Sequence, residues 1–270
     1  MTVKYSFGVA GCGNMGSAIL KGSLTSGPFK ASDVAVFDLF EQKREECRSL
    51  GCAVLSSAAE VFASCKRVLL AVKPQSMDAL LKELASLKKP YPLIICIVAG
   101  FPSAKIRAVL PGAHVVRVMP NTPLLLGCGA TALCPCEGTT DKELEDAKAL
   151  FDRLGETAVL RDENKMNDII AVNGSSPAFV YYFIEALARW GESRGMSYGD
   201  CLRLCAKTFE GSAKMILRGD VPPAELIRRV CSPGGTTLAA MSVLEEKEAD
   251  GALRAAADAC TKRAIELSQL

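Results

Sequence analysis

Three glycines near the beginning of the chain have the spacing that dinucleotide binding requires. Gly11, Gly13 and Gly16 follow an apolar stretch typical of a buried strand and precede apolar residues at helical spacing. In such a turn the first glycine permits a tight bend, the second lets the backbone approach a bulky anion, and the third lets the helix pack closely on the strand. The first helical amides, those of Asn14 and Met15, would then face a pyrophosphate, which the helix dipole favours. A purely structural turn is the alternative, because this spacing also occurs by chance.

An acidic residue ends the next predicted strand, residues 33–38. Asp38 follows the glycines by about 20 residues, where a carboxylate suits a hydrogen bond to the ribose 2′-hydroxyl of NAD(H). The same charge would repel the 2′-phosphate of NADPH, although Lys43 and Arg44 follow one helical turn later and could offset that repulsion. Asp38 could instead simply cap the next helix.

Two further loops fall at predicted carboxyl ends of strands, where ligands bind in open α/β sheets. In AVKPQ, residues 71–75, Pro74 ends the strand and Lys73 could reach the phosphates or ribose of a cofactor. In MPNTP, residues 119–123, two prolines fix Asn121, whose side-chain amide could pair with a nicotinamide carboxamide. A solvated lysine and ordinary turn chemistry are the structural alternatives.

A second glycine-rich stretch, CSPGGTT at residues 231–237, lies between predicted helices. Two adjacent glycines at the start of a helix leave successive amides free, and such a nest suits a small carboxylate. Ser232, Thr236 and Thr237 add three hydroxyls. A helix-capping turn is the alternative, but capping needs neither both glycines nor three hydroxyls.

The remaining chemistry-bearing residues exclude several mechanisms. The sequence has one histidine, His114, at the start of a predicted strand, so no Ser-His-Asp or Cys-His arrangement can be assembled. The triplet Cys134-Pro135-Cys136 has no second pair nearby, and we predict no metal site. A substrate that arrives as a protonated iminium ion would need no strong acid from the protein.

Composition narrows the class of protein further. The balance of 32 basic and 30 acidic residues, a net charge of +2, argues against nucleic-acid binding. Of the 12 cysteines, Cys12 lies in the glycine turn, Cys96 in a predicted strand, and Cys201, Cys205 and Cys260 in predicted helices. We therefore expect reduced thiols and a cytoplasmic protein. We expect no membrane helix, since the most apolar stretch, residues 175–190, is interrupted by Glu185 and Arg189.

Strand and helix patterns alternate up to residue 161 and then give way to helices. Strands are predicted at residues 5–10, 33–38, 67–72, 91–100, 114–120, 129–135 and 156–161. Helices are predicted from Asn14 onward and at residues 41–51, 76–87, 103–110, 141–155, 163–174, 176–195, 198–219, 222–230 and 248–270. We therefore expect an α/β protein with a Rossmann-type doubly wound parallel sheet in residues 1–161. Residues 162–270 form an expected all-helical domain whose broad apolar faces favour a dimer at least.

The stretches GVAGCGNMG, AVKPQ, RVMPNTP, NGSSPAF and CSPGGTT, in this order and at this spacing, resemble pyrroline-5-carboxylate reductase over roughly residues 5–268. The resemblance implies reduction of 1-pyrroline-5-carboxylate to L-proline with NADPH or NADH, the last step of proline biosynthesis. It also implies a helical domain that interlocks into homodimers, which in many members assemble into decamers.

The resemblance assigns roles to particular residues. It places the substrate carboxylate on the amides of Gly234, Gly235 and Thr236, and the Thr237 hydroxyl near the ring nitrogen, with Ser232 as a further substrate-binding and catalytic side chain. The implied cofactor contacts outside the glycine turn are Ala71, Val72, Lys73, Pro74, Ala99 and Asn121. Two departures from the family pattern are Ser176, where a glycine is frequent, and Asp38, which is uncommon in members that prefer NADPH.

Two other classes of function remain open from the sequence. A β-hydroxyacid or coenzyme-F420-linked dehydrogenase shares the plan of sheet plus helices, but it would need a catalytic lysine in a glycine-rich motif. Lys165, Lys207 and Lys214 lie in the helical part, and none has that setting. A non-catalytic nucleotide sensor would retain the first domain, but it would have no need of a carboxylate nest at residues 231–237.

Overall fold

The computed structural model describes residues 3–269, and the chain divides into two compact units. The first contains the residues up to Ser175 together with those from Asp258 onward, and the second contains Ser176–Ala257. The packing units thus divide the chain later than the domain boundary expected at 161/162. That boundary, drawn from the change of pattern, stays a prediction.

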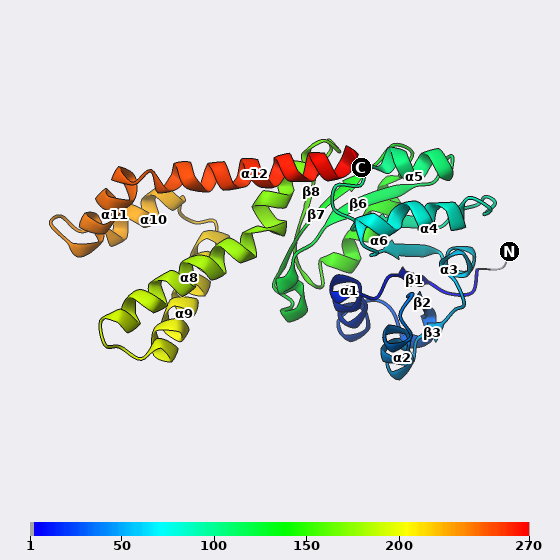
Figure 1. Ribbon diagram of the computed structural model, residues 1–270, viewed down its shortest axis with the longest axis horizontal. Helices are drawn as coiled ribbons and strands as arrows, with labels where there is room; N and C mark the ends of the chain where they lie inside the picture. The colour runs from blue at the N-terminus through cyan, green and yellow to red at the C-terminus, as the bar shows by residue number, and fades with distance from the viewer. Residues whose placement is uncertain (1–2, 270) are drawn as a thin grey trace. The chain divides into compact units, whose positions relative to one another are not determined.

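The first unit is built on one eight-stranded sheet with the order β3-β2-β1-β4-β5-β6-β7-β8 (Figure 1). Its strands are β1 Phe7–Ala10, β2 Val34–Phe37, β3 Ala53–Val54, β4 Arg67–Leu70, β5 Leu93–Cys96, β6 Val115–Met119, β7 Gly129–Pro135 and β8 Gly155–Val159. All neighbours pair in parallel except β6 and β7. The expected doubly wound α/β fold is confirmed. β7 runs antiparallel to β6 because the connecting residues 120–128 are too few for the crossover between parallel strands, which needs about a dozen residues or more.

Helices cover both faces of this sheet, which is why most residues of its central strands are apolar and buried. One core joins the sheet to α1 Asn14–Thr25, α2 Glu41–Ser49 and α6 Asp141–Phe151. The other joins it to α3 Ala58–Ser64, α4 Met77–Leu84 and α5 Ser103–Val109. Successive residues of β4 pack into opposite cores. Val68 and Leu70 lie in the core with α3, α4 and α5, and Leu69 lies in the core with α1, α2 and α6. Burial of each such side chain contributes about 1.5–3 kcal/mol.

Two short elements, β3 and α3, were not predicted from the sequence. β3 has two residues and α3 has seven, which is too short for a periodic pattern to stand out. α3 is nevertheless well defined, because the Ser57 hydroxyl accepts a hydrogen bond from the amide of Glu60, and Val61 and Phe62 are buried. α3 lies next to β1 and β2 and so helps to fix the part of the sheet that carries the glycine turn.

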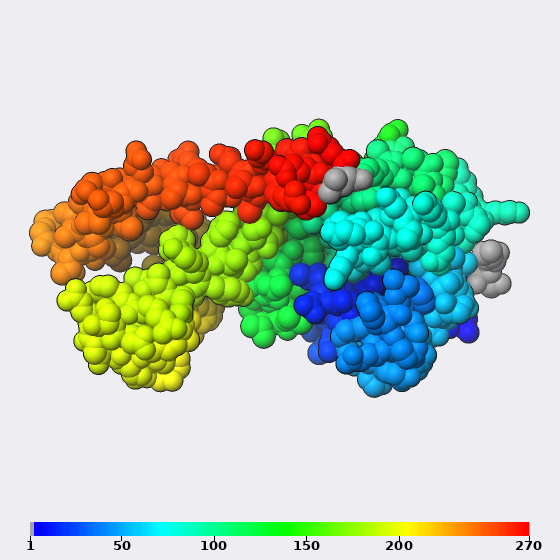
Figure 2. All heavy atoms as spheres, viewed as in Figure 1, coloured from blue at the N-terminus to red at the C-terminus, as the bar shows by residue number. Residues whose placement is uncertain are grey.

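The second unit consists of helices, and most of their large apolar side chains are exposed. Its helices are α8 Ser176–Ser193, α9 Tyr198–Leu217, α10 Pro223–Val230, α11 Thr236–Glu246 and the first part of α12, Ala249–Gln269. α8 and α9 pack as one block (Figure 2). A side chain added at Gly191 would lie 2.5 Å from the Cys201 sulfur, which shows how close the two helices are. Trp190, Leu204 and Leu244 are more than half exposed in the single chain. Such faces are characteristic of an oligomer interface.

The connection between the units is helical. α7, Lys165–Ile169, runs into a π-helical turn at Ile170–Gly174, and α8 begins after Ser175. The Ser175 amide donates to the carbonyl of Ile170 at 2.7 Å. The predicted loop at NGSSPAF is therefore a wide helical turn, in which Pro177 occupies the second position of α8, where its missing N–H costs little.

An ion pair between the buried Arg117 and the half-buried Glu163 holds together three segments at the carboxyl edge of the sheet. Glu163 accepts hydrogen bonds from the Ser103 amide at 2.7 Å and the Ser103 hydroxyl at 2.6 Å, and Arg117 lies 3.3 Å away. Burial opposes ionisation of Glu163, but the Ser103 hydrogen bonds and the Arg117 charge outweigh it and lower its pKa below the ordinary 4.5. The ion pair thus fixes the start of α5 against β6.

We expect Glu163→Gln to lower the free energy of unfolding at neutral pH by about 2 kcal/mol, because it leaves the Arg117 guanidinium buried without its counter-charge. A carboxyl group with a lowered pKa in the folded state stabilises above its ordinary pKa of 4.5, and this contribution is lost as pH falls through the folded value. Denaturant unfolding between neutral and acid pH should therefore show the two proteins converging as the solution is acidified. A difference in the free energy of unfolding that stays the same at every pH would contradict this role.

Candidate active site

The first glycine turn joins β1 to α1, and its three glycines have different reasons to be glycine. Gly11 has a φ of +99°, and a side chain there would meet the backbone of Ala71 at 2.7 Å. A side chain at Gly16 would overlap the carbonyl oxygen of Gly11. At Gly13, in contrast, a Cβ would meet nothing within 4 Å. The fold needs the first and third glycines, while the second only keeps a space clear.

The start of α1 suits a phosphate group. The helix begins at Asn14 after Gly13, with no side-chain cap and no acidic residue in its first turn. The first amides of an α-helix have no partner within the helix, and they carry the positive end of its dipole. The open space in front of Gly13 lets an anion come close to them. These features fit the pyrophosphate of a dinucleotide at Gly11, Gly13, Asn14, Met15 and Gly16.

Asp38 lies directly behind this turn and braces it. One carboxylate oxygen accepts the Cys12 amide at 2.6 Å, the other accepts the Phe40 amide at 2.9 Å, and the residue is buried. The sequence pointed to Asp38 as a ribose-binding carboxylate. The structure turns the side chain toward these two backbone groups, so its observed part is to hold the glycine turn against the end of β2. Contact with a ribose stays a prediction.

This placement changes the expected effect of removing the carboxylate. We expect Asp38→Ala to lower the affinities for NADH and NADPH about equally, by about tenfold. The reason is that the loss of a charge-assisted hydrogen bond loosens the glycine turn, which binds both cofactors. Dissociation constants from cofactor fluorescence would measure this. If NADPH affinity rose while NADH affinity fell, this would show that the carboxylate binds the ribose 2′-hydroxyl of NADH instead.

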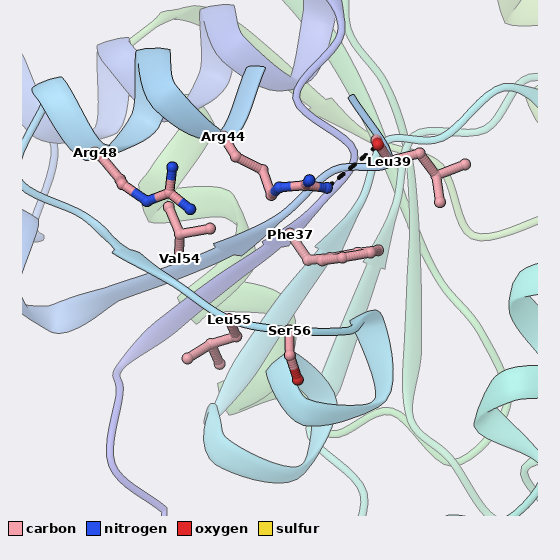
Figure 3. A pocket seen from close by; sticks show the side chains of 7 residues that line it. All are labelled: Phe37, Leu39, Arg44, Arg48, Val54, Leu55 and Ser56. Atoms are coloured by element: carbon pink, nitrogen blue, oxygen red, sulfur yellow. Dashed lines mark hydrogen bonds between the residues drawn. The ribbon is translucent and has the colours of Figure 1, made fainter. Parts of the chain in front are cut away.

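A pocket of about 420 Å³ opens beside the end of β2 (Figure 3). Its apolar walls are Phe37, Leu39, Val54 and Leu55. Two arginines of α2, Arg44 and Arg48, and the hydroxyl-bearing Ser56 complete the lining. Arg44 is expected near the cofactor from the sequence, whereas no motif points to Arg48 or Ser56. Arg48 lies on the same face of α2 as Arg44, and Ser56 follows β3, a strand that was not predicted. The fold alone brings these residues to one pocket.

The other predicted cofactor residues lie at the same carboxyl edge, where the ends of parallel strands meet. Ala71 follows β4, and its amide donates to the carbonyl of Ala10 at 2.9 Å. Val72 is half-buried, Lys73 is exposed, Pro74 begins a short 3-10 helix, and Ala99 follows β5 as a half-buried residue. Their contacts with a cofactor stay predictions.

Asn121 has structural partners on both ends of its side-chain amide. Its Oδ1 accepts the Ala130 amide at 2.9 Å, and its Nδ2 donates to the Asn173 carbonyl at 3.1 Å. Asn173 in turn donates to the carbonyl of Met119 at 2.7 Å. Asn121 thus ties the end of β6 to β7 and to the π-helical turn. The predicted bond to a nicotinamide carboxamide would use the second amide proton of Nδ2 or the second lone pair of Oδ1.

The second glycine turn, in the second unit, has the form expected of an anion nest at the start of α11. The Gly235 amide donates to the Ser232 carbonyl at 2.9 Å, and Gly234 has a φ of +67°, as a tight turn after Pro233 requires. The first turn of α11 has neither a side-chain cap nor an acidic residue. The amide of Gly235 is therefore engaged within the turn, while those of Thr236 and Thr237 belong to the open helix end.

Other kinds of site are not seen in residues 3–269. No group of three or more His, Cys, Asp or Glu side chains in this range could hold a metal ion. All 12 cysteines are free thiols. None of the helices described has the length and apolar character to cross a membrane.

Fold and site together define an NAD(P)H-dependent oxidoreductase with an α/β dinucleotide-binding domain and a helical second domain. Residues 6–100 match the model of the family "NADP oxidoreductase coenzyme F420-dependent", and residues 163–267 match "Pyrroline-5-carboxylate reductase dimerisation". The pyrroline-5-carboxylate reductase of Pseudomonas aeruginosa is 36% identical over 96% of this chain and 95% of its own length. That of Escherichia coli is 35% identical over 99% of this chain and all of its own.

A solved structure shows the same relationship. The crystal structure of Plasmodium falciparum pyrroline carboxylate reductase with NADP bound is 26% identical, covers 99% of this chain and 100% of that one, and has a TM-score of 0.86. The chain belongs to the pyrroline-5-carboxylate reductase family. It carries the dimerisation domain of that family, which confirms the oligomer expected from its apolar helices.

Proposed function

We propose that this protein reduces the C=N bond of 1-pyrroline-5-carboxylate with NAD(P)H and forms L-proline. The observation that carries the proposal is the turn at residues 231–237, where a tight Pro-Gly-Gly bend opens a helix with an uncapped, acid-free first turn. A small cyclic acid has one carboxylate, and the free amides of this turn can bind a single carboxylate. A nucleotide sensor would have no use for it.

We propose the following division of labour among the chain's own residues. The amides of the first glycine turn hold the pyrophosphate of the cofactor, and the loop at Ala71–Pro74, together with Ala99, contacts its remainder. NAD(P)H, when bound, supplies the hydride. The amides of Gly234 and Thr236 bind the substrate carboxylate, and the engaged Gly235 amide keeps the turn in shape. Ser232 and Thr237 supply hydroxyls beside the bound ring.

The proposed chemistry asks little acid–base work of the protein. An iminium substrate already carries its proton, so the residues act by positioning and by a fixed electrostatic environment. The Thr237 hydroxyl, in the first turn of α11, is suited to orient the ring nitrogen by hydrogen bonding. The single histidine, His114, is paired with Glu143 at 2.8 Å, which supports its exclusion from the reaction.

The rival hydroxyacid dehydrogenase would need a free lysine base. Lys165 pairs with Asp168 and Lys207 pairs with Glu210, each on its own helix, as solvated surface residues do. Neither lysine lies in the glycine-rich motif that the dehydrogenase would need, which favours the reductase over that rival.

We further propose that the homodimers assemble into a larger oligomer such as a decamer and that the protein works in the cytoplasm. The exposed apolar helices of the second unit support the first point, and 12 free thiols suit a reducing compartment. Sedimentation analysis of the purified protein would give the size of the assembly.

The experiment that tests the proposed reaction follows NAD(P)H oxidation with and without 1-pyrroline-5-carboxylate and identifies the product. We expect oxidation to depend on the cyclic imine and to yield L-proline. Oxidation that instead follows a hydroxyacid's keto form would support the dehydrogenase, and cofactor binding with no substrate-dependent oxidation would support a sensor.

A further inference from the structure

We infer that the pocket beside β2 selects the 2′-phosphate of NADPH, with Arg44 and Arg48 as specificity-determining residues. The inference rests on the proposed function only in taking the glycine turn as the site of the cofactor's pyrophosphate. β1, which leads into the glycine turn, pairs with β2, which leads into the pocket. The adenosine end of a dinucleotide bound at α1 therefore falls at the end of β2.

The shape of the pocket fits the adenosine end of a cofactor. Its volume of about 420 Å³ lies in the range of small-molecule sites. Phe37, Leu39, Val54 and Leu55 offer apolar walls of the kind that accept a flat base. Leu39 is 74% exposed in this structure, and a side chain of that size left open beside a pocket is suited to cover a ligand.

Arg44 is positioned by the backbone at the end of β2. Its Nη1 donates to the carbonyl of Asp38 at 2.6 Å and to that of Leu39 at 3.2 Å, the second of which is drawn in Figure 3. A guanidinium group has five donors in a rigid plane, so anchoring through Nη1 leaves Nε and Nη2 for an anion. These two nitrogens now contact Glu41.

Arg48 lies one helical turn further along α2 and lines the same pocket. It pairs with Glu41 and Glu45 on the helix surface, where all three side chains are at least 44% exposed. Exposed ion pairs of this kind contribute little and are readily exchanged. A phosphate group can accept two parallel hydrogen bonds from a guanidinium, as a carboxylate can, and it carries a larger negative charge.

The negative groups near the pocket do not occupy it. The side chains that line it include two arginines and, among the described residues, no carboxylate. Asp38, whose carboxylate would repel a 2′-phosphate, directs both oxygens at the amides of Cys12 and Phe40. Ser56 donates its hydroxyl to Glu60 at 2.7 Å, so we assign it no phosphate contact. Glu41 pairs with both arginines from outside the lining, so a 2′-phosphate would have to displace its carboxylate from them. The charged side chains of the lining itself are positive, which favours NADPH, whereas Asp38 suggests NADH in the sequence.

The test uses binding of adenosine fragments, which needs no catalysis. Calorimetric titration of the full-length protein with 2′,5′-ADP and with 5′-AMP isolates the 2′-phosphate. We expect 2′,5′-ADP to bind at least about tenfold more tightly. Arg44→Gln and Arg48→Gln should each reduce that ratio severalfold and together bring it close to one. Arg161→Gln, which removes an exposed arginine elsewhere on the first unit, should leave the ratio intact.

Equal affinities for the two fragments in the unaltered protein would overturn the inference, as would a double variant that keeps the preference. Arg48→Gln alone decides the matter if Arg44→Gln unfolds, because Arg48 makes no backbone contact that holds β2. The outcome is independent of the proposed reaction. A protein that prefers 2′,5′-ADP but does not reduce the cyclic imine would refute the proposed reaction and support the role of the pocket. A protein that reduces the cyclic imine but binds both fragments equally would support the reaction and refute the role of the pocket.

Discussion

Gly13→Val is expected to lower cofactor affinity about 100-fold while leaving the fold unchanged. Gly13 has a φ of −65°, which any residue can adopt, and a Cβ there meets nothing within 4 Å. The added side chain would therefore stand in the space where the pyrophosphate approaches the first amides of α1. Each hydrogen bond to a charged group contributes about 1.5–3 kcal/mol, so the loss of one or two accounts for the expected change.

A size series sharpens this experiment. Gly13→Ala should fall between the native protein and Gly13→Val in affinity for NADPH, and all three should remain folded, with only the small loss of stability that replacing an N-cap glycine causes. Gly16→Ala is the contrasting variant, because its Cβ would overlap the Gly11 carbonyl oxygen and should destabilise the protein itself. Unaltered cofactor binding by a folded Gly13→Val protein would show that the pyrophosphate does not lie at this turn.

Thr237→Ala has the second large expected effect, a fall in kcat of about 100-fold with little change in NADPH affinity. Thr237 is the second residue of α11, so its hydroxyl lies at the helix end that we propose for the substrate. A hydrogen bond that orients the ring nitrogen is needed in the reaction but not for binding the cofactor. Steady-state kinetics with the cyclic imine, together with direct cofactor titration, separates the two quantities.

Two neighbouring variants serve as controls for Thr237. Thr237→Ser keeps the hydroxyl and should recover most of the activity. Thr236→Ala removes an exposed hydroxyl whose residue contributes only its amide, so we expect a change of at most a few-fold. A Thr237→Ala protein with native turnover would remove this hydroxyl from the mechanism.

The sequence was sufficient to predict the elements that carry strong periodicity. β1, β2 and α2 lie within two residues of the predicted ranges, and β7 matches 129–135 fully. α1 begins at the predicted Asn14. Their apolar runs are read directly because a parallel sheet buries both faces. Both glycine turns were found for the same local reason, since each requires a residue type at a fixed spacing.

What the sequence could not provide is the direction in which polar side chains point. Asp38 stands at the position of a ribose-binding acid, yet it faces two backbone amides that only the folded turn brings to it. Arg48 acquires its setting from Val54 and Leu55, which lie in and after a two-residue strand with no visible pattern. The bonds of Glu163 to Ser103 span 60 residues of sequence. Contacts of this range depend on packing, which no short motif encodes.

The most direct test of the account supplies NADPH deuterated at C4 of the nicotinamide, in the transferable position, together with 1-pyrroline-5-carboxylate. Mass spectrometry of the product then follows the label. We predict L-proline with one deuterium on ring carbon C5, because both ligands are held for direct hydride transfer. Unlabelled proline, or oxidised cofactor without proline, would contradict the central claim.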